Sequence, residues 1–117
     1  MKKTKMLKKN YEFSKIFSKG NYFSGKTIEA FILNNRTGFN YLGLAISVKS
    51  GYAYQRNMVK RLLRENYRLL EPKLLTGYSI VFLWKKGQNI EKANFYQIKK
   101  DMIEIAKKAK IMICEVK

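Results

Sequence analysis

The chain has 117 residues, enough for one domain with a modest hydrophobic core. Its 25 lysine and arginine residues stand against eight acidic residues and no histidine, and the net charge of +17 indicates a polyanionic partner, with nucleic acid favoured over an anionic membrane. A hydrophobic content of 46% argues against a disordered basic tail, and the longest apolar run, Ile80–Trp84, is far too short to span a bilayer.

The N-terminal segment is rich in lysine, and no apolar stretch follows it that would make it a secretory signal. We expect residues 1–9 to form a mobile basic arm. The single cysteine, Cys114, cannot form an internal disulfide, which is compatible with a reducing compartment. These features predict a cytoplasmic protein with one nucleic-acid-binding domain over residues 1–117 and no membrane partner, and they do not point to a protein oligomer.

A short helix is predicted between Asn10 and Gly20, because Phe13, Ile16 and Phe17 are spaced to share one helical face. A short strand at Tyr22 and Phe23 and a longer one over residues 27–33 follow. Residues 41–49 alternate between large apolar and small side chains. The small ones, Gly43, Ala45 and Ser47, leave room above that face either for a packed helix or for a ligand.

Residues 51–70 form the next predicted helix, which ends before Pro72, the only proline. Wound at about 100° per residue, its side chains separate into two arcs. The apolar arc, which we expect to face the core, contains Met58, Val59, Leu62, Leu63, Leu69 and Leu70. The other arc contains Arg56, Asn57, Lys60, Arg61, Arg64 and Arg68. Cations repeated every four residues repel one another, so this face either stays solvated or binds a polyanion.

The last two predicted elements are a buried strand and a basic helix. Residues 78–84 are nearly all apolar, as in an interior strand covered on both faces. Asn94 is expected to cap a final helix with an apolar stripe that starts at Phe95. The element order α-β-β-β-α-β-α predicts the α+β class: a two-layer sandwich with about four strands in a mixed sheet and three helices.

The segment from Gly51 resembles the signature of the bacterial ribonuclease P protein family, Gly-Asn-Ala-Val-x-Arg-Asn-Arg-x-Lys-Arg-x-x-Arg-Glu. Eight residues match in order and spacing: Gly51, Ala53, Arg56, Asn57, Lys60, Arg61, Arg64 and Glu65. Tyr52 stands where asparagine is usual, and Met58 replaces the second arginine of the Arg-Asn-Arg triplet. Most of the chain is covered, since an N-terminal Leu-Lys-Lys-Asn-x-x-Phe-x-x-x-Phe segment and the flanking strands also fit.

This resemblance implies the protein subunit of ribonuclease P, which assists a catalytic RNA in removing the 5′ leader of precursor tRNA. It implies Mg²⁺ held mainly by the RNA, with none bound tightly by the protein, and a left-handed crossover around the signature helix. It also implies the partners of two surfaces. The basic arc would bind the catalytic RNA, and Phe13, Phe17, Phe31 and Lys49 would form a cleft for the leader.

The residues themselves leave two roles open. The three phenylalanines are core residues by default, and Asn57 suits a local hydrogen bond as well as an RNA contact. A protein-based catalytic site is not indicated, because there is no histidine and the carboxylates are scattered. The closest pair, Asp101 and Glu104, is expected to form local ion pairs with lysines. The alternatives to a ribonuclease P subunit are a structural RNA-binding protein of ribosomal type and, less favoured, a metal-dependent nuclease.

Overall fold

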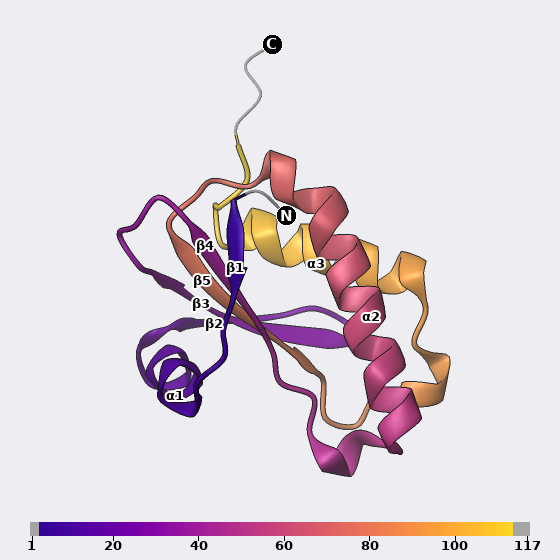
Figure 1. Cartoon of the computed structure of the whole chain (residues 1–117). Coiled ribbons are helices and arrows are strands. Elements are labelled where there is room, and N and C mark those ends of the chain that lie inside the picture. Colours follow the sequence, from indigo (N-terminus) through magenta and orange to yellow (C-terminus); the bar gives the residue numbers. More distant parts are fainter. Residues whose placement is uncertain (1–2, 114–117) are drawn as a thin grey trace.

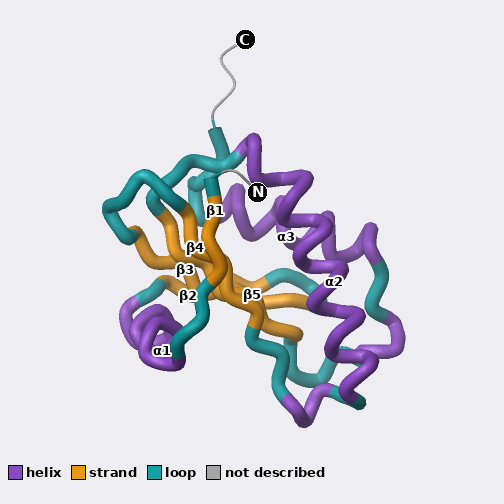
Figure 2. The backbone as a smooth tube through the Cα atoms, in the orientation of Figure 1, coloured by secondary structure: helices purple, strands orange, loops and turns teal. Residues whose placement is uncertain are grey.

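The computed structural model describes residues 3–113. A five-stranded mixed sheet is flanked by helices on both faces (Figures 1 and 2). The strands are β1 (Thr4–Met6), β2 (Asn21–Ser24), β3 (Ile28–Asn34), β4 (Asn40–Leu44) and β5 (Tyr78–Trp84), in the sheet order β1-β4-β5-β3-β2. The helices are α1 (Asn10–Lys19), α2 (Ala53–Leu70) and α3 (Phe95–Lys108), with single 3-10 turns η1 (Val48–Ser50), η2 (Glu71–Lys73) and η3 (Ile90–Lys92).

The α+β class is confirmed, but the sheet has one more strand than predicted. Residues 3–9 are not a mobile arm, because β1 pairs in parallel with β4. Thr4 is buried there, and its hydroxyl lies 2.7 Å from that of Tyr67 on α2. A three-residue strand flanked by lysines has too little alternation to be seen in the sequence. Residues 1–2 and Cys114 lie outside the described residues.

The side-chain alternation of the strands divides the interior into two clusters. Even-numbered residues, among them Ile28, Leu42 and Ile80, pack against α2 and α3 in the main core. Odd-numbered residues, among them Phe31 and Val81, pack against α1 in a smaller cluster. The two-layer prediction therefore describes α2 and α3, whereas α1 covers the opposite face of the sheet (Figure 1).

The central strand β5 lies between β4, with which it is parallel, and β3, with which it is antiparallel. Its residues are almost all buried, as the continuous apolar run predicts. β4 ends at Leu44, earlier than predicted, and the chain then turns through η1, where the Ser47 hydroxyl accepts a hydrogen bond from the Lys49 amide. None of the helices within residues 3–113 is both long enough and apolar enough to cross a membrane.

Candidate nucleic-acid interface

The rotation of α2 about its axis is set by the residues that it buries. Val59, Leu63, Tyr67 and Leu70 contact the sheet and α3 with little or no exposed surface. The predicted apolar arc is displaced relative to this face: Met58 and Leu69 are exposed, and Leu62 is only half-buried. Gln55, Asn66 and Tyr67 are buried instead. Gln55 accepts a hydrogen bond from the Tyr52 amide, the side-chain amide of Asn66 donates one to the Leu62 carbonyl, and the Tyr67 hydroxyl bonds that of Thr4, which makes their burial tolerable.

The predicted basic arc lies on the solvent side of this helix. Arg61, Arg64, Arg68 and Asn57 are exposed, while Arg56 and Lys60 are half-buried. Arg68 forms an exposed ion pair with Glu65 at 3.1 Å, and among residues 3–113 the only other ion pair is Lys108–Glu104. The remaining cations of the arc therefore present their charge to solvent. We call Arg56, Asn57, Lys60, Arg61, Arg64 and Arg68 the basic face.

Arg56 differs from the other members of the basic face. Its Nε donates a hydrogen bond to the Gly51 carbonyl at 3.2 Å, so it also holds the turn before α2. Next to this turn, the exposed rings of Tyr52 and Tyr54 lie almost parallel, with an interplanar angle of 8° and centroids 6.1 Å apart. Such exposed rings can stack on unpaired bases. The signature spacing did not point to them, because both stand where the family pattern has other residues.

The three phenylalanines of the predicted cleft lie together on the α1 face of the sheet. The Phe17 ring meets the Phe31 ring edge-on at 5.2 Å, and Tyr22 adds a third ring 5.3 Å from Phe31. Phe13 is half-buried over β4, in contact distance of Gly43. The small-residue face of this strand therefore accommodates a packed helix. Phe17 is 37% exposed and Tyr22 is 51% exposed, so both rings are open to solvent, whereas Phe31 between them is half-buried.

Lys49 lines a hollow of about 370 Å³ beyond this cluster. Leu83 of β5 connects the two, since it packs against the same small core cluster as Phe13 and Phe31 and also lines the hollow. Lys85 belongs to the same hollow, and its Nζ donates hydrogen bonds to the Ser24 hydroxyl at 2.7 Å and the Gly25 carbonyl at 3.1 Å. Aromatic rings and cations thus lie side by side here. We call Phe13, Phe17, Phe31, Lys49 and this hollow the aromatic cleft.

Tyr22 and Lys85 were not predicted as site residues. The hydroxyl of Tyr22 donates a hydrogen bond to the Glu29 carboxylate, and this bond raises the pKa of Tyr22. Its position follows from the antiparallel register in which Tyr22 pairs with Phe31. The sequence contained that signal only in part, because the short strand at Tyr22 was predicted but its pairing partner was not.

The two surfaces lie on opposite sides of the sheet, with α2 on one side and α1 on the other (Figure 1). They approach each other at η1, which carries Lys49 and precedes the first turn of α2. A partner that binds both surfaces would therefore have to contact two faces of the protein.

The carboxylates do not gather at either surface. Among residues 3–113, no group of three or more histidine, cysteine, aspartate or glutamate side chains is arranged to hold a metal ion. The expectation for Asp101 was wrong: it is buried and accepts hydrogen bonds from the Thr27 amide at 2.8 Å and from Gln97 at 2.8 Å, so it fixes the start of β3 against α3. Glu104 does pair with Lys108, at 3.1 Å.

Comparison with known proteins gives consistent matches. The family model described as Ribonuclease P matches residues 1–110. The ribonuclease P protein component of Natranaerobius thermophilus is 35% identical over 91% of this chain and 90% of its own length. That of Clostridioides difficile is 36% identical over 95% of this chain and 96% of its own. The Staphylococcus aureus RNase P protein superposes with a TM-score of 0.80 at 28% identity, covering 91% of this chain and 95% of its own.

Proposed function

The chain belongs to the ribonuclease P protein component family, and from this premise we propose that its basic face binds the catalytic RNA while its aromatic cleft binds the 5′ leader of precursor tRNA. As the protein subunit of ribonuclease P, it is part of a ribonucleoprotein endoribonuclease of tRNA processing. Within that enzyme, its contribution is to supply two binding surfaces for RNA.

The observation that supports binding of the catalytic RNA by the basic face is the charge of α2. Lys60, Arg61 and Arg64 project from one side of a helix whose other side is fixed in the core, and no carboxylate pairs with them among the described residues. Arginine donates two parallel hydrogen bonds to phosphate oxygens, and a rigid row of such donors suits structured RNA recognised through its backbone. Each neutralised phosphate releases condensed counterions, which favours association.

The second half rests on the open ring of Phe17 beside Phe31, next to the lysines of the neighbouring hollow. Single strands are bound by stacking of bases on aromatic rings together with charge along the backbone. The leader is single-stranded, so its unpaired bases can stack on the rings while its phosphates contact the lysines. Asn57 lies within the basic face and is exposed, which favours an RNA contact over the alternative local role.

We place catalysis on the RNA partner and Mg²⁺ with that RNA. The chain has no histidine to act as a general base, and its most buried acidic residue, Asp101, is committed to hydrogen bonds with Thr27 and Gln97. The protein would lower the electrostatic cost of bringing two RNAs together, and with it the Mg²⁺ concentration that cleavage requires. As a subunit of an enzyme that processes tRNA precursors, the protein would act in the cytoplasm.

The test is cleavage of precursor tRNA by the catalytic RNA over a Mg²⁺ titration, with and without this protein. We expect the protein to shift the titration to lower Mg²⁺ and to increase affinity for precursor over mature tRNA. Unchanged Mg²⁺ dependence would contradict the role of the basic face, and cleavage of the precursor by the RNA-free protein would contradict the placement of catalysis.

A further inference from the structure

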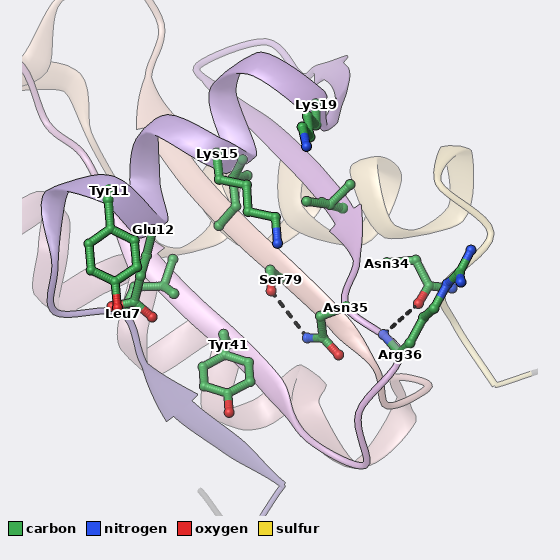
Figure 3. A pocket seen from close by; sticks show the side chains of 12 residues that line it. Leu7, Tyr11, Glu12, Lys15, Lys19, Asn34, Asn35, Arg36, Tyr41 and Ser79 are labelled. Atoms are coloured by element: carbon green, nitrogen blue, oxygen red, sulfur yellow. Dashed lines mark hydrogen bonds between the residues drawn. The ribbon is translucent and has the colours of Figure 1, made fainter.

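A second hollow, of about 600 Å³, lies on the same face of the sheet as the aromatic cleft but on the other flank of α1. Figure 3 shows the side chains that line it. Tyr11, Lys15 and Lys19, spaced four residues apart, face this hollow. Phe13 and Phe17 are offset from them by two residues, which is about 200° around the helix. The hollow is thus separate from the aromatic cleft.

The strand register separates the two sites in the same way. Leu33 pairs with Ser79 under the second hollow, whereas Glu29 pairs with Leu83 beside the aromatic cleft. Four residues of strand correspond to roughly 13 Å. Helix α1 crosses the sheet between them. We call the hollow the Tyr11 groove.

The lining of the Tyr11 groove combines rings, cations and an apolar floor. Leu7, Ile16 and Leu33 form the floor. Tyr11 from α1 and Tyr41 from β4 lie at one end, and Lys15 projects between them and Asn35 (Figure 3). The Tyr11 ring is 67% exposed, and the ammonium of Lys9 lies 5.8 Å from its centroid. The ring is therefore open to stacking and already has a cation next to it.

The far end of the groove is held in a fixed shape by the loop after β3. The Asn34 side chain accepts a hydrogen bond from the Arg36 amide at 2.9 Å. Asn35 donates to the Ser79 hydroxyl at 3.1 Å and accepts from the Thr37 amide at 2.9 Å. Arg36 itself has a φ of 56°, in the left-handed region that these side-chain bonds support. These bonds hold the backbone at Arg36 in place at the rim of the groove, so binding does not have to order the loop itself.

The charge of the groove selects an anion. Lys15, Lys19 and Arg36 line it, and none is in either ion pair of the described residues. The single acid is Glu12, whose carboxylate already accepts the backbone amide of Lys9 at 3.0 Å. A ligand with flat rings and regularly spaced negative charge matches tyrosines on an apolar floor with cations at the rim. Nucleotides have that chemistry.

We propose that the Tyr11 groove is a second single-stranded RNA site, which stacks an unpaired base on Tyr11 and holds adjacent phosphates with Lys15, Lys19 and Arg36. The inference deepens the proposed function, since it takes an RNA partner as given. The strand has two possible sources in the holoenzyme: the part of the leader distal to the aromatic cleft, or unpaired nucleotides of the catalytic RNA.

The test uses the double variant Tyr11→Ala/Lys15→Ala in the reconstituted holoenzyme. Both side chains are exposed, so the helix is expected to fold normally, which a melting curve verifies. The matched control is Tyr96→Ala/Lys99→Ala on α3, where Tyr96 is 77% exposed. We expect the groove variant to lose about tenfold in affinity for one of the two RNAs, the magnitude of one lost stack, and the control to change less than twofold.

Two arms identify the source. If the groove variant loses affinity for precursor tRNA with a long leader but not for precursor tRNA with a short leader, the groove binds the leader. A loss in binding of the protein to catalytic RNA without substrate assigns it to that RNA. In addition, a photocrosslinking amino acid at position 11 should label nucleotides of the assigned strand. Affinities equal to those of the control variant in both arms, with no crosslink above that from position 96, overturn the proposal.

Phe17→Ala in the same assays separates this inference from the proposed function. If Phe17→Ala weakens leader binding and the groove variant does not, the result supports leader binding by the aromatic cleft and contradicts RNA binding by the Tyr11 groove. If the groove variant alone weakens binding, the reverse holds. If both variants bind RNA as tightly as the control variant, neither the aromatic cleft nor the Tyr11 groove is an RNA-binding site.

Discussion

The Phe13 ring lies directly over the backbone of Gly43: a Cβ added to Gly43 would be 2.5 Å from Cε1 of Phe13 and 2.9 Å from Cδ1 of Leu7. This contact joins α1 to β4 and sets the height of the helix above the sheet. Both the aromatic cleft and the Tyr11 groove depend on that height, because α1 forms a wall of each.

Gly43→Ala should therefore destabilise the protein by about 1–3 kcal/mol, since α1 must shift or Phe13 must leave its rotamer. Urea denaturation measures this loss. Gly38→Ala is the matched control, because a Cβ there would meet nothing within 4 Å. Equal stability of the two variants would show that α1 is not held by this contact.

Leu63→Ala should cost about 2–5 kcal/mol, because Leu63 is fully buried between α2 and the sheet. Leu69→Ala, further along the same helix, should change stability by less than about 0.5 kcal/mol, because Leu69 is 51% exposed. The comparison of melting curves tests the rotation of α2. Similar losses at both positions would mean that the helix is turned toward the arc expected from sequence.

Arg64→Ala should leave the melting temperature nearly unchanged and weaken binding to the catalytic RNA, with the slope of log K against log salt reduced by about 0.7–0.9 for one lost phosphate contact. Arg56→Ala should also lower stability, because Arg56 bonds the Gly51 carbonyl. Lys107→Ala, an exposed cation of α3, is the control. A salt slope for Arg64→Ala equal to that of the control would remove Arg64 from the interface.

Phe17→Ala should reduce holoenzyme affinity for precursor tRNA with a leader by about tenfold, the value of a lost base stack, with mature tRNA unaffected. Phe39→Ala is matched in exposure, 40% against 37%, and lies in the loop before β4. The measurement is the affinity of holoenzyme containing each variant for precursor tRNA and for mature tRNA. Equal losses for precursor and mature tRNA would return Phe17 to a packing role.

Tyr67→Phe should destabilise the protein by about 1–3 kcal/mol at neutral pH, because the buried hydroxyl of Thr4 loses its partner at 2.7 Å. Burial raises the pKa of Tyr67 above its usual 10.0, so the protonated phenol stabilises the fold below that pH. This stability is lost as the pH rises from about 10 through the folded-state pKa.

The difference between wild type and Tyr67→Phe should therefore shrink above about pH 10. Denaturation at several alkaline pH values measures it, with Tyr96→Phe as the exposed control. A pH-independent difference would contradict the burial of an ionisable phenol at this position. No loss at neutral pH would contradict the anchoring of β1 by Thr4.

Much of the fold was predictable because its signals are local. The continuous apolar run at 78–84 identified β5, and Asn94 caps α3 as expected, accepting a hydrogen bond from the Gln97 amide at 2.8 Å. The separation of cations from apolar residues identified α2, and the signature spacing identified the family. Each of these patterns is carried by residues close together in the chain, so periodicity and capping chemistry suffice.

Only the tertiary structure determined which residues far apart in the chain contact one another. The pairing of β1 with β4 is anchored by Thr4 reaching Tyr67, 63 residues away, which no local pattern encodes. The burial of Asp101 depends on the Thr27 amide, and the exposure of Leu69 depends on how α2 is rotated against the sheet and α3. The Tyr11 groove exists only because α1 lies across the sheet, so its residues, drawn from α1, β3, β4, β5 and the segments next to α1 and β3, share no sequence signal.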